Sequence, residues 1–426
     1  MNNQNSTTLT KNLCKDLNVD EELISFNDET LNLSNEIESD FPSELLKKEG
    51  IPLFEYQQEI VTQLLDTSPM KSGLLSLPTG AGKTRTALAV CLEGIANNSL
   101  KSIVWLATTM ELIDQAFESA KELFKTHGDI DTIFLSKNLD DFQHHPEIPT
   151  IIFETPQKVF SDVQSKTKLA SYPDLVIFDE AHQATAETYS EALKYLGCQS
   201  SDNPTPLIGL SATPGRAKSK ETEDLVKMFQ EQLLTAPSLG NNPIAKLEEL
   251  KILSKVEFKM IPVNNWPAKE NVRRRLELIY KLTKKLLSQK TIEGRQKKPL
   301  IFAPSVDAAI ALSTVFKATG IKAEAIHSRL EMENRRHYIK EFAEGRLDVL
   351  TNERILATGY DCPAISDVIF GTEIGSPIQF EQMVGRASRG QRTGGSKKST
   401  IWQFEDHIQL HGLPKSYRRY EDYRWE

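Results

Sequence analysis

Short apolar runs that alternate with helical stretches constrain the fold of this 426-residue chain more than any other feature. From about residue 51 onward, five such runs lie at 74–77, 102–107, 150–153, 175–178 and 207–210. Runs of this length without polar alternation are typical of strands buried on both faces of a parallel sheet. After a charged connecting stretch at roughly 217–262, five further runs lie at 300–303, 323–326, 347–350, 368–370 and 399–404. The pattern predicts two α/β domains in tandem, each built on a parallel sheet.

The composition excludes several classes of protein. With 39% hydrophobic and 26% charged residues, the chain is too apolar to be disordered throughout. Its four cysteines, Cys14, Cys91, Cys198 and Cys362, are isolated from one another, which excludes a CxxC zinc pair and argues against a disulfide framework. No run approaches the roughly 20 apolar residues of a membrane-spanning helix. The first residues lack the basic and apolar segments of a secretion signal, so we expect a cytoplasmic protein.

Charge is distributed unevenly. Residues 1–50 hold eleven acidic residues against four lysines, which accounts for most of the net charge of −8. This leader is rich in Asn and Ser and poor in aromatic residues, so we expect disorder or at most one weak helix, with a regulatory or partner-binding arm as the alternative. Residues 266–298 hold eleven cations against three acids, and Leu276, Ile279 and Leu286 recur at helical spacing. An amphipathic helix is predicted, whose cations are either simply solvated or follow a phosphate backbone.

A glycine-rich loop follows the run at 74–77. It consists of Thr79, Gly80, Ala81, Gly82, Lys83, Thr84 and Arg85, and a helical stretch comes next. The glycines let backbone amides approach phosphate oxygens, Lys83 can reach the outer phosphates, and Thr84 can offer its hydroxyl to Mg²⁺. Leu77 takes the place of the first glycine of the full GxxxxGK[ST] pattern, which leaves an ordinary glycine turn as the alternative. The order of strand, loop and helix favours the phosphate loop.

Two carboxylates, Asp179 and Glu180, follow the run at 175–178. The carboxyl ends of strands in an open parallel sheet line the ligand crevice, so this pair can face the phosphate loop. One carboxylate can hold Mg²⁺ through water while its neighbour polarises the attacking water, as hydrolysis of a phosphoanhydride requires. Thr84 and Asp179 are thus the candidate metal ligands. Outside this context, an Asp-Glu pair is more typical of a solvated turn.

With these residues the chain resembles the superfamily 2 helicases and translocases over residues 53–405. Motifs of that family occur in family order: Tyr56-Gln57, 79–85, Thr155-Pro156-Gln157, Asp179–His182, Ser211–Thr213, Ile301–Ser305, Thr358–Asp361 and Gln382–Arg389. The resemblance implies two tandem RecA-like parallel-sheet domains with ATP in the cleft between them. We expect the domains at 47–248 and 249–410, an acidic leader at 1–46 and a tail at 411–426.

The resemblance also implies a role for each site residue. Gln57 would read adenine, and the loop residues, Gly359 and Asp361 would bind the nucleotide. Arg386 and Arg389 would reach the γ-phosphate and neutralise charge in the transition state, as arginine fingers do. Residues that couple the ATP site to nucleic acid would be His182, Ser211, Thr213 and Gln382. Thr109, Thr155 and Asn352 would contact the nucleic-acid backbone, the alternative being ordinary turn or cap residues.

Departures from the family pattern narrow the subgroup. His182 stands where DEAD-box RNA helicases carry Asp, and Gln382-Met383 matches neither the His-Arg nor the Gln-Arg pair of RNA helicases. The Gly-x-Asp-x-Pro form at 359–363 resembles the DNA-directed group that contains XPB, RadD and the motor subunits of restriction enzymes. Phe54-Glu55 replaces the Arg-Pro that precedes Tyr-Gln in this group, which weakens the case for adenine selectivity.

The leading hypothesis is an ATP-dependent nucleic-acid translocase or helicase that uses Mg²⁺ and acts on DNA rather than RNA. No large accessory domain is expected after Arg389, which motivates an alternative: an ATP-switched motor subunit that serves a partner nuclease or effector in a defence, repair or restriction complex. An RNA helicase is a third hypothesis with the same chemistry. If the acidic leader occupies the nucleic-acid groove, deletion of residues 1–45 should tighten DNA binding at low salt.

Overall fold

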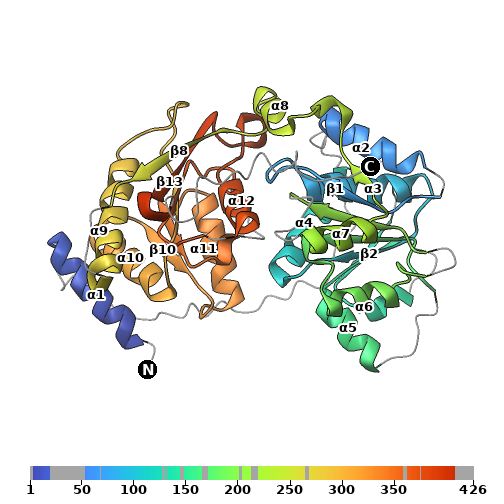
Figure 1. Ribbon diagram of the computed structural model, residues 1–426, viewed down its shortest axis with the longest axis horizontal. Helices are drawn as coiled ribbons and strands as arrows, with labels where there is room; N and C mark the ends of the chain where they lie inside the picture. Colours follow the sequence, from blue (N-terminus) through green and yellow to red (C-terminus); the bar gives the residue numbers. More distant parts are fainter. Residues whose placement is uncertain are drawn as a thin grey trace. The chain divides into compact units, whose positions relative to one another are not determined.

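The computed structural model describes residues 3–19, 53–67, 69–126, 130, 132–143, 148–165, 171–200, 204–212, 219–263, 268–357, 362–374 and 376–407. This part of the chain divides into two compact units, each with its own sheet (Figure 1). The first unit comprises residues 53–247, and the second comprises residues 3–19 together with 248–407. The division lies beside the expected boundary between residues 248 and 249.

The first unit is a parallel sheet flanked by helices. Its strands are β1 (Gly73–Ser76), β2 (Ser102–Leu106), β3 (Phe134–Ser136), β4 (Thr150–Glu154), β5 (Leu175–Asp179), β6 (Leu207–Ser211) and β7 (Leu233–Leu234), in the order β3-β4-β2-β5-β6-β1-β7. Its helices are α2 (Glu55–Leu65), α3 (Lys83–Ala96), α4 (Met110–Thr126), α5 (Pro156–Ser165), α6 (Glu187–Tyr195) and α7 (Ser219–Met228), and α8 (Pro243–Glu249) leads to the second unit. All five predicted runs are strands. The sequence pattern missed only the short edge strands β3 and β7, because periodicity is not measurable over three and two residues.

The second unit has the same architecture. Its strands are β8 (Lys255–Ile261), β9 (Pro299–Phe302), β10 (Ala323–Ile326), β11 (Val349–Asn352), β12 (Asp367–Phe370) and β13 (Lys398–Phe404), in the parallel order β10-β11-β9-β12-β13-β8. Its helices are α1 (Asn3–Leu17), α9 (Ala268–Leu287), α10 (Val306–Ala318), α11 (Met332–Ala343) and α12 (Pro377–Gly385). Strand β8 was expected to be part of an irregular connection. It lies at the sheet edge, mostly exposed, and its alternating charges hide the strand signal.

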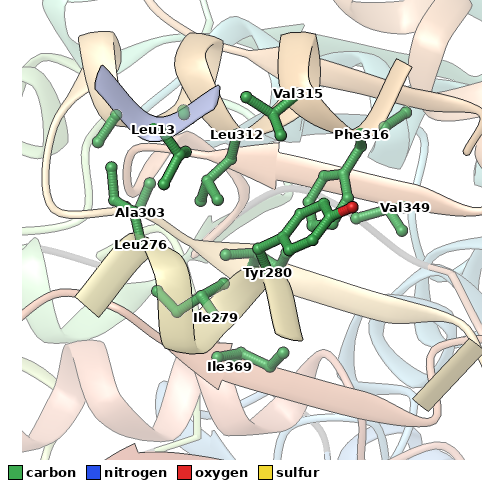
Figure 2. Packing of buried hydrophobic residues seen from close by; sticks show 14 of the residues in the cluster. Leu13, Leu276, Ile279, Tyr280, Ala303, Leu312, Val315, Phe316, Val349 and Ile369 are labelled. Atoms are coloured by element: carbon green, nitrogen blue, oxygen red, sulfur yellow. The ribbon is translucent and has the colours of Figure 1, made fainter. Parts of the chain in front are cut away.

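Helix α1 corrects the expectation of a disordered leader over its first part. It packs against α10 and α9, with Leu13 and Cys14 fully buried (Figure 1). Leu13 lies in one apolar cluster with Leu276 and Leu312 (Figure 2). At the helix end, Asp16 Oδ2 is 2.7 Å from Arg273 Nε. Residues 20–46 of the expected leader lie outside the described residues.

The predicted basic amphipathic helix is α9, and its apolar face is buried as expected. Its cations are not all on the solvent face, however. Arg275 is 6% exposed, with its guanidinium against Asp406 and His407 and over the Phe404 ring. Lys284 and Lys285 are exposed. Arg275 therefore stabilises the fold, and a charge count from sequence overstates the cations available to a ligand.

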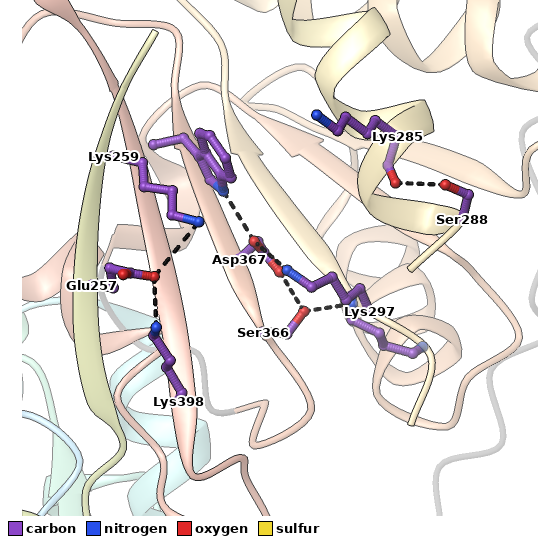
Figure 3. A network of polar contacts seen from close by, with 10 residues as sticks. Glu257, Lys259, Lys285, Ser288, Lys297, Ser366, Asp367 and Lys398 are labelled. Atoms are coloured by element: carbon purple, nitrogen blue, oxygen red, sulfur yellow. Dashed lines mark hydrogen bonds and ion pairs between the residues drawn. The ribbon is translucent and has the colours of Figure 1, made fainter. Parts of the chain in front are cut away.

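A buried carboxylate, Asp367, organises the start of β12. It is fully buried and receives hydrogen bonds from Lys297 Nζ at 3.1 Å, Trp402 Nε1 at 3.0 Å and Ser366 Oγ at 2.8 Å (Figure 3). Buried charges persist only when paired and hydrogen-bonded. Lys297, counted among the basic residues of the connecting stretch, is therefore also committed to the fold. In the described part of the chain, no helix combines the length and apolarity needed to cross a membrane.

Candidate active site

The glycine-rich loop connects β1 to α3 in the conformation that a phosphate loop requires. Gly80 and Gly82 have φ angles of 93° and 80°, the left-handed region that favours glycine. Ala81 N donates to Pro78 O at 3.0 Å, and Lys83 Nζ donates to Leu77 O at 3.2 Å. The loop thus wraps the N-terminus of α3, where the first backbone amides have no partner within the helix and the helix dipole favours anions.

Side chains from α2 hold this loop from behind. Tyr56 Oη donates to Ala81 O at 2.7 Å. Gln57 Nε2 donates to Gly82 O at 3.4 Å and to Thr86 Oγ1 at 3.2 Å, while Gln57 Oε1 accepts from Phe54 N at 3.0 Å. Gln57 is only 1% exposed. The adenine-reading role expected of Gln57 conflicts with this geometry, because its amide is engaged with the protein.

The predicted carboxylates lie on the same edge of the sheet as the loop. In the strand register Asp179 pairs with Leu210 of β6, and Ser211 of β6 pairs with Ser76 of β1. Glu180 has a φ of 53°, a left-handed conformation that costs energy in a non-glycine residue and recurs at functional sites. This turn lets Glu180 N donate to Asp179 Oδ1 at 2.9 Å.

Electrostatics link Asp179 to the phosphate loop. Burial raises the pKa of Asp179 to about 7, and the neighbouring Glu180 carboxylate adds to the rise, whereas Lys83 opposes it. Glu180 Oε2 is 3.3 Å from His182 Nδ1, and His182 is 6% exposed. The structure therefore brings Lys83, Asp179, Glu180 and His182 together, as the sequence predicted.

Thr84 and Asp179 have the chemistry of Mg²⁺ ligands. Both supply oxygen atoms, and Mg²⁺ in phosphate-transferring sites is held by one or two protein oxygens together with the phosphates. Two adjacent carboxylates, one of them buried, repel each other, and a divalent cation relieves that repulsion. The residues present fit the ion, and Thr84 and Asp179 would hold it.

Ser211, a predicted coupling residue, lies at the base of the loop. It is fully buried, and its carbonyl accepts from Leu77 N at 3.3 Å. Thr213, predicted to act with it, lies outside the described residues. Thr86 was not identified from sequence: its hydroxyl donates to Gly82 O at 3.0 Å and accepts from Gln57. A threonine in the first turn of a helix gives no signal of such a role, because the partner comes from α2.

In the second unit, the predicted arginines follow α12. Gln382 is 7% exposed, and its carbonyl accepts from Arg386 Nε at 3.2 Å. Arg389 forms a bridge with Leu253, so the segment after α12 is tied to the start of the unit. Both arginines are partly exposed. Gly359 and Asp361 lie outside the described residues.

The three residues expected to contact nucleic acid have structural roles. Thr109 Oγ1 accepts from Leu112 N and Thr155 Oγ1 accepts from Lys158 N, each at 3.3 Å, so both hydroxyls cap helices. The cap alternative is thereby confirmed for them. Asn352 is fully buried, with its amide bonded to Ile301 O and to the backbone N of residue 356. The prediction that Asn352 contacts nucleic acid is wrong, because its side chain fills the domain interior.

Two family models match this chain, one on each unit. The type III restriction enzyme res subunit matches residues 50–216, and the helicase conserved C-terminal domain matches residues 279–391. The chain belongs to the superfamily 2 helicases. The res-subunit match confirms the predicted relation to the motor subunits of restriction enzymes.

Relatives of this superfamily 2 helicase are distant in sequence. A protein of the Sulfolobus islandicus filamentous virus, named as helicase 22, is 24% identical over 341 residues, which are 76% of this chain and 59% of the viral protein. The ATP-dependent RNA helicase DBP3 of Candida glabrata is 23% identical over 337 residues, 78% of this chain and 58% of DBP3. The chain thus spans less than two thirds of the length of these two relatives.

Solved structures confirm the predicted fold. Saccharomyces cerevisiae Dbp5, bound to RNA and ADP BeF3, superposes with a TM-score of 0.60 and 19% identity, covering 87% of this chain and 88% of Dbp5. The DNA-bound type ISP restriction-modification enzyme LlaBIII superposes with a TM-score of 0.62 and 17% identity, covering 84% of this chain and 28% of LlaBIII. Two tandem RecA-like units are therefore the architecture of this helicase.

Proposed function

We propose that this helicase is a nucleic-acid-stimulated ATPase that couples hydrolysis to movement along, or remodelling of, a DNA strand. The observation that carries the proposal is the arrangement at one edge of the first sheet. There the phosphate loop and Lys83 lie with the Asp179 and Glu180 carboxylates, on three neighbouring strands. A loop that binds a polyphosphate beside a paired carboxylate is the minimum that phosphoanhydride hydrolysis requires.

Each residue of the first unit has a chemical task in this proposal. The loop amides and Lys83 hold the outer phosphates, and Thr84 and Asp179 hold the cation. Mg²⁺, when bound, supplies positive charge to the outer phosphates. Glu180 polarises the attacking water, and the contact of its Oε2 with His182 Nδ1 at 3.3 Å orients the carboxylate.

Arg386 and Arg389 complete the proposed chemistry. They are partly exposed at the end of α12 and can meet the γ-phosphate when ATP closes the two units. A guanidinium at that position stabilises charge that develops in the transition state, which is worth about 10³–10⁵ in rate in related chemistry. Opening after hydrolysis would then release the nucleotide and advance the strand.

DNA is preferred over RNA as the partner for two reasons. The Gly-x-Asp-x-Pro form at 359–363 resembles DNA-directed motors, and the first unit matches the res subunit of type III restriction enzymes. Because relatives and structural neighbours include RNA helicases, the choice needs a direct competition between matched DNA and RNA.

The test is a panel of ATPase assays with single-stranded DNA, double-stranded DNA and RNA. Wild-type hydrolysis should rise with DNA, and Lys83→Ala should abolish it, while Lys71→Ala, which changes an exposed lysine near β1, should leave it intact. If no nucleic acid stimulates hydrolysis and Lys83→Ala changes nothing, the proposal is refuted.

A second candidate is an ATP-switched motor subunit that delivers closure to a partner nuclease or effector. It is favoured by the comparison with LlaBIII, of which this chain covers only 28%. An isolated chain that hydrolyses ATP on DNA without unwinding it would support this candidate. Robust unwinding by the isolated chain would contradict it.

A further inference from the structure

The contacts between α2 and the phosphate loop carry an inference about nucleotide selection that rests on the proposed ATPase. We propose that Tyr56 and Gln57 are positioning residues that preset the amides of the phosphate loop, and that Gln57 does not read the base. The ligand recognised with their help is the polyphosphate of a nucleoside triphosphate.

The contacts are buried and closely fitted. Tyr56 is 1% exposed and stacks on Phe54, with 5.9 Å between ring centroids, so its hydroxyl is held at Ala81 O. Gln57 packs so closely on the loop that a Cβ added to Gly82 would lie 2.6 Å from Gln57 Nε2. Glycine at position 82 is therefore required twice, by its φ of 80° and by the amide against it.

Peptide geometry turns these contacts into an orientation of the anion site. In a planar trans peptide, the carbonyl of one residue and the N–H of the next point in opposite directions. Tyr56 holds the carbonyl of Ala81 and Gln57 holds the carbonyl of Gly82 on the α2 side. The N–H groups of Gly82 and Lys83 consequently point away from α2, as donors at the start of α3 must to meet a phosphate.

Hydrogen-bond capacity excludes Gln57 from base recognition in this arrangement. A side-chain amide has two N–H donors, and Gln57 uses them on Gly82 O and Thr86 Oγ1. A glutamine that recognises adenine donates to N7 while accepting from the N6 amino group. To do so, Gln57 would have to release the loop. The same amide cannot both preset the loop and read the base.

This distinction has a measurable signature. If Gln57 acts on the loop, its removal weakens every ligand that carries the polyphosphate by the same factor, whatever the base. If Gln57 reads adenine, its removal weakens ATP alone and brings ATP closer to GTP. The ratio of the two affinities therefore reports the role of Gln57 independently of any general loss of stability.

The experiment uses the full chain with the variants Gln57→Ala and Gln57→Glu. The second keeps the acceptor for Phe54 N, removes both donors, and is nearly isosteric, so it tests the donors where Gln57→Ala fails to fold. Gln58→Ala, which changes the exposed neighbour, is the matched control, and Tyr56→Phe removes the contact with Ala81 O alone. The affinities of ATP, GTP and inorganic tripolyphosphate are measured by displacement of a fluorescent nucleotide.

We expect Gln57→Ala, Gln57→Glu and Tyr56→Phe each to weaken all three ligands by a common factor of about 5–20, as loss of one or two buried hydrogen bonds predicts. The ATP-to-GTP ratio should equal that of wild type. A ratio that falls toward one, with unchanged affinity for tripolyphosphate, overturns the proposal. Absence of hydrolysis by the wild type would refute the proposed ATPase only, because the displacement assay measures the ratio without turnover.

Discussion

Truncation of Leu13 tests whether α1 is part of the second unit. The side chain of Leu13 is fully buried in one cluster with Leu276 of α9 and Leu312 of α10 (Figure 2). Leu13→Ala removes apolar contacts and leaves a cavity, which costs about 3 kcal/mol at a fully buried position. The ion pair of Asp16 with Arg273 adds little, because both side chains are partly exposed and solvent screens them.

The expected effect is large enough to measure. For a unit of this size, each kcal/mol lowers the midpoint of thermal unfolding by about 2–4 °C, so Leu13→Ala should lower it by about 6–12 °C. Calorimetry separates the two units if they unfold apart, and hydrogen exchange locates the effect. Exchange should accelerate in α9 and α10, which pack on α1, and stay unchanged in β5 and β6 of the first unit.

The control is Asn12→Ala, which changes the exposed neighbour in the same helix and should shift the midpoint by less than about 2 °C. If Leu13→Ala behaves like this control, and α9 and α10 exchange as in wild type, α1 does not pack on the second unit. The disorder expected from the composition of the leader would then hold for α1 as well.

Three further predictions follow from the site and the charge distribution. Because burial raises the pKa of Asp179 to about 7, above its value in the unfolded chain, the neutral form favours folding; without Mg²⁺ the free energy of unfolding should fall as pH rises through 7. In urea titrations at pH 5 and pH 8, Asp179→Asn should remove that fall, and an unchanged pH dependence would contradict the assignment. Gly82→Ala should abolish nucleotide binding in the displacement assay, because a Cβ there meets the amide nitrogen of the neighbouring glutamine at 2.6 Å; retained binding would show that the loop tolerates another conformation. Deletion of residues 1–45 would also remove α1, so neutralising Glu36, Glu38 and Asp40 is the cleaner test of leader inhibition: DNA binding should tighten at low salt, and unchanged affinity and salt slope would refute it.

Much of the fold and part of the site could be predicted from sequence because both depend on local order along the chain. Contiguous apolar runs separated by helical stretches leave few alternatives to a parallel sheet, and all ten predicted runs are strands. In such a sheet the carboxyl ends of strands share one edge. Lys83 and Asp179 could therefore be placed together although 95 intervening positions separate Thr84 from Asp179 in the count along the chain.

The tertiary structure decided what each side chain contacts. The few apolar residues of α1 suggested disorder, but α9 and α10 offer the surface that buries them, more than 250 positions further along the chain. Gln57 carries the expected residue type at the expected place, yet its donors are used by Gly82 and Thr86. Asn352 follows an apolar run as a ligand residue would, yet it is buried. Periodicity in a sequence reports burial within one element, whereas the partner of a polar atom depends on elements brought together only when the chain folds.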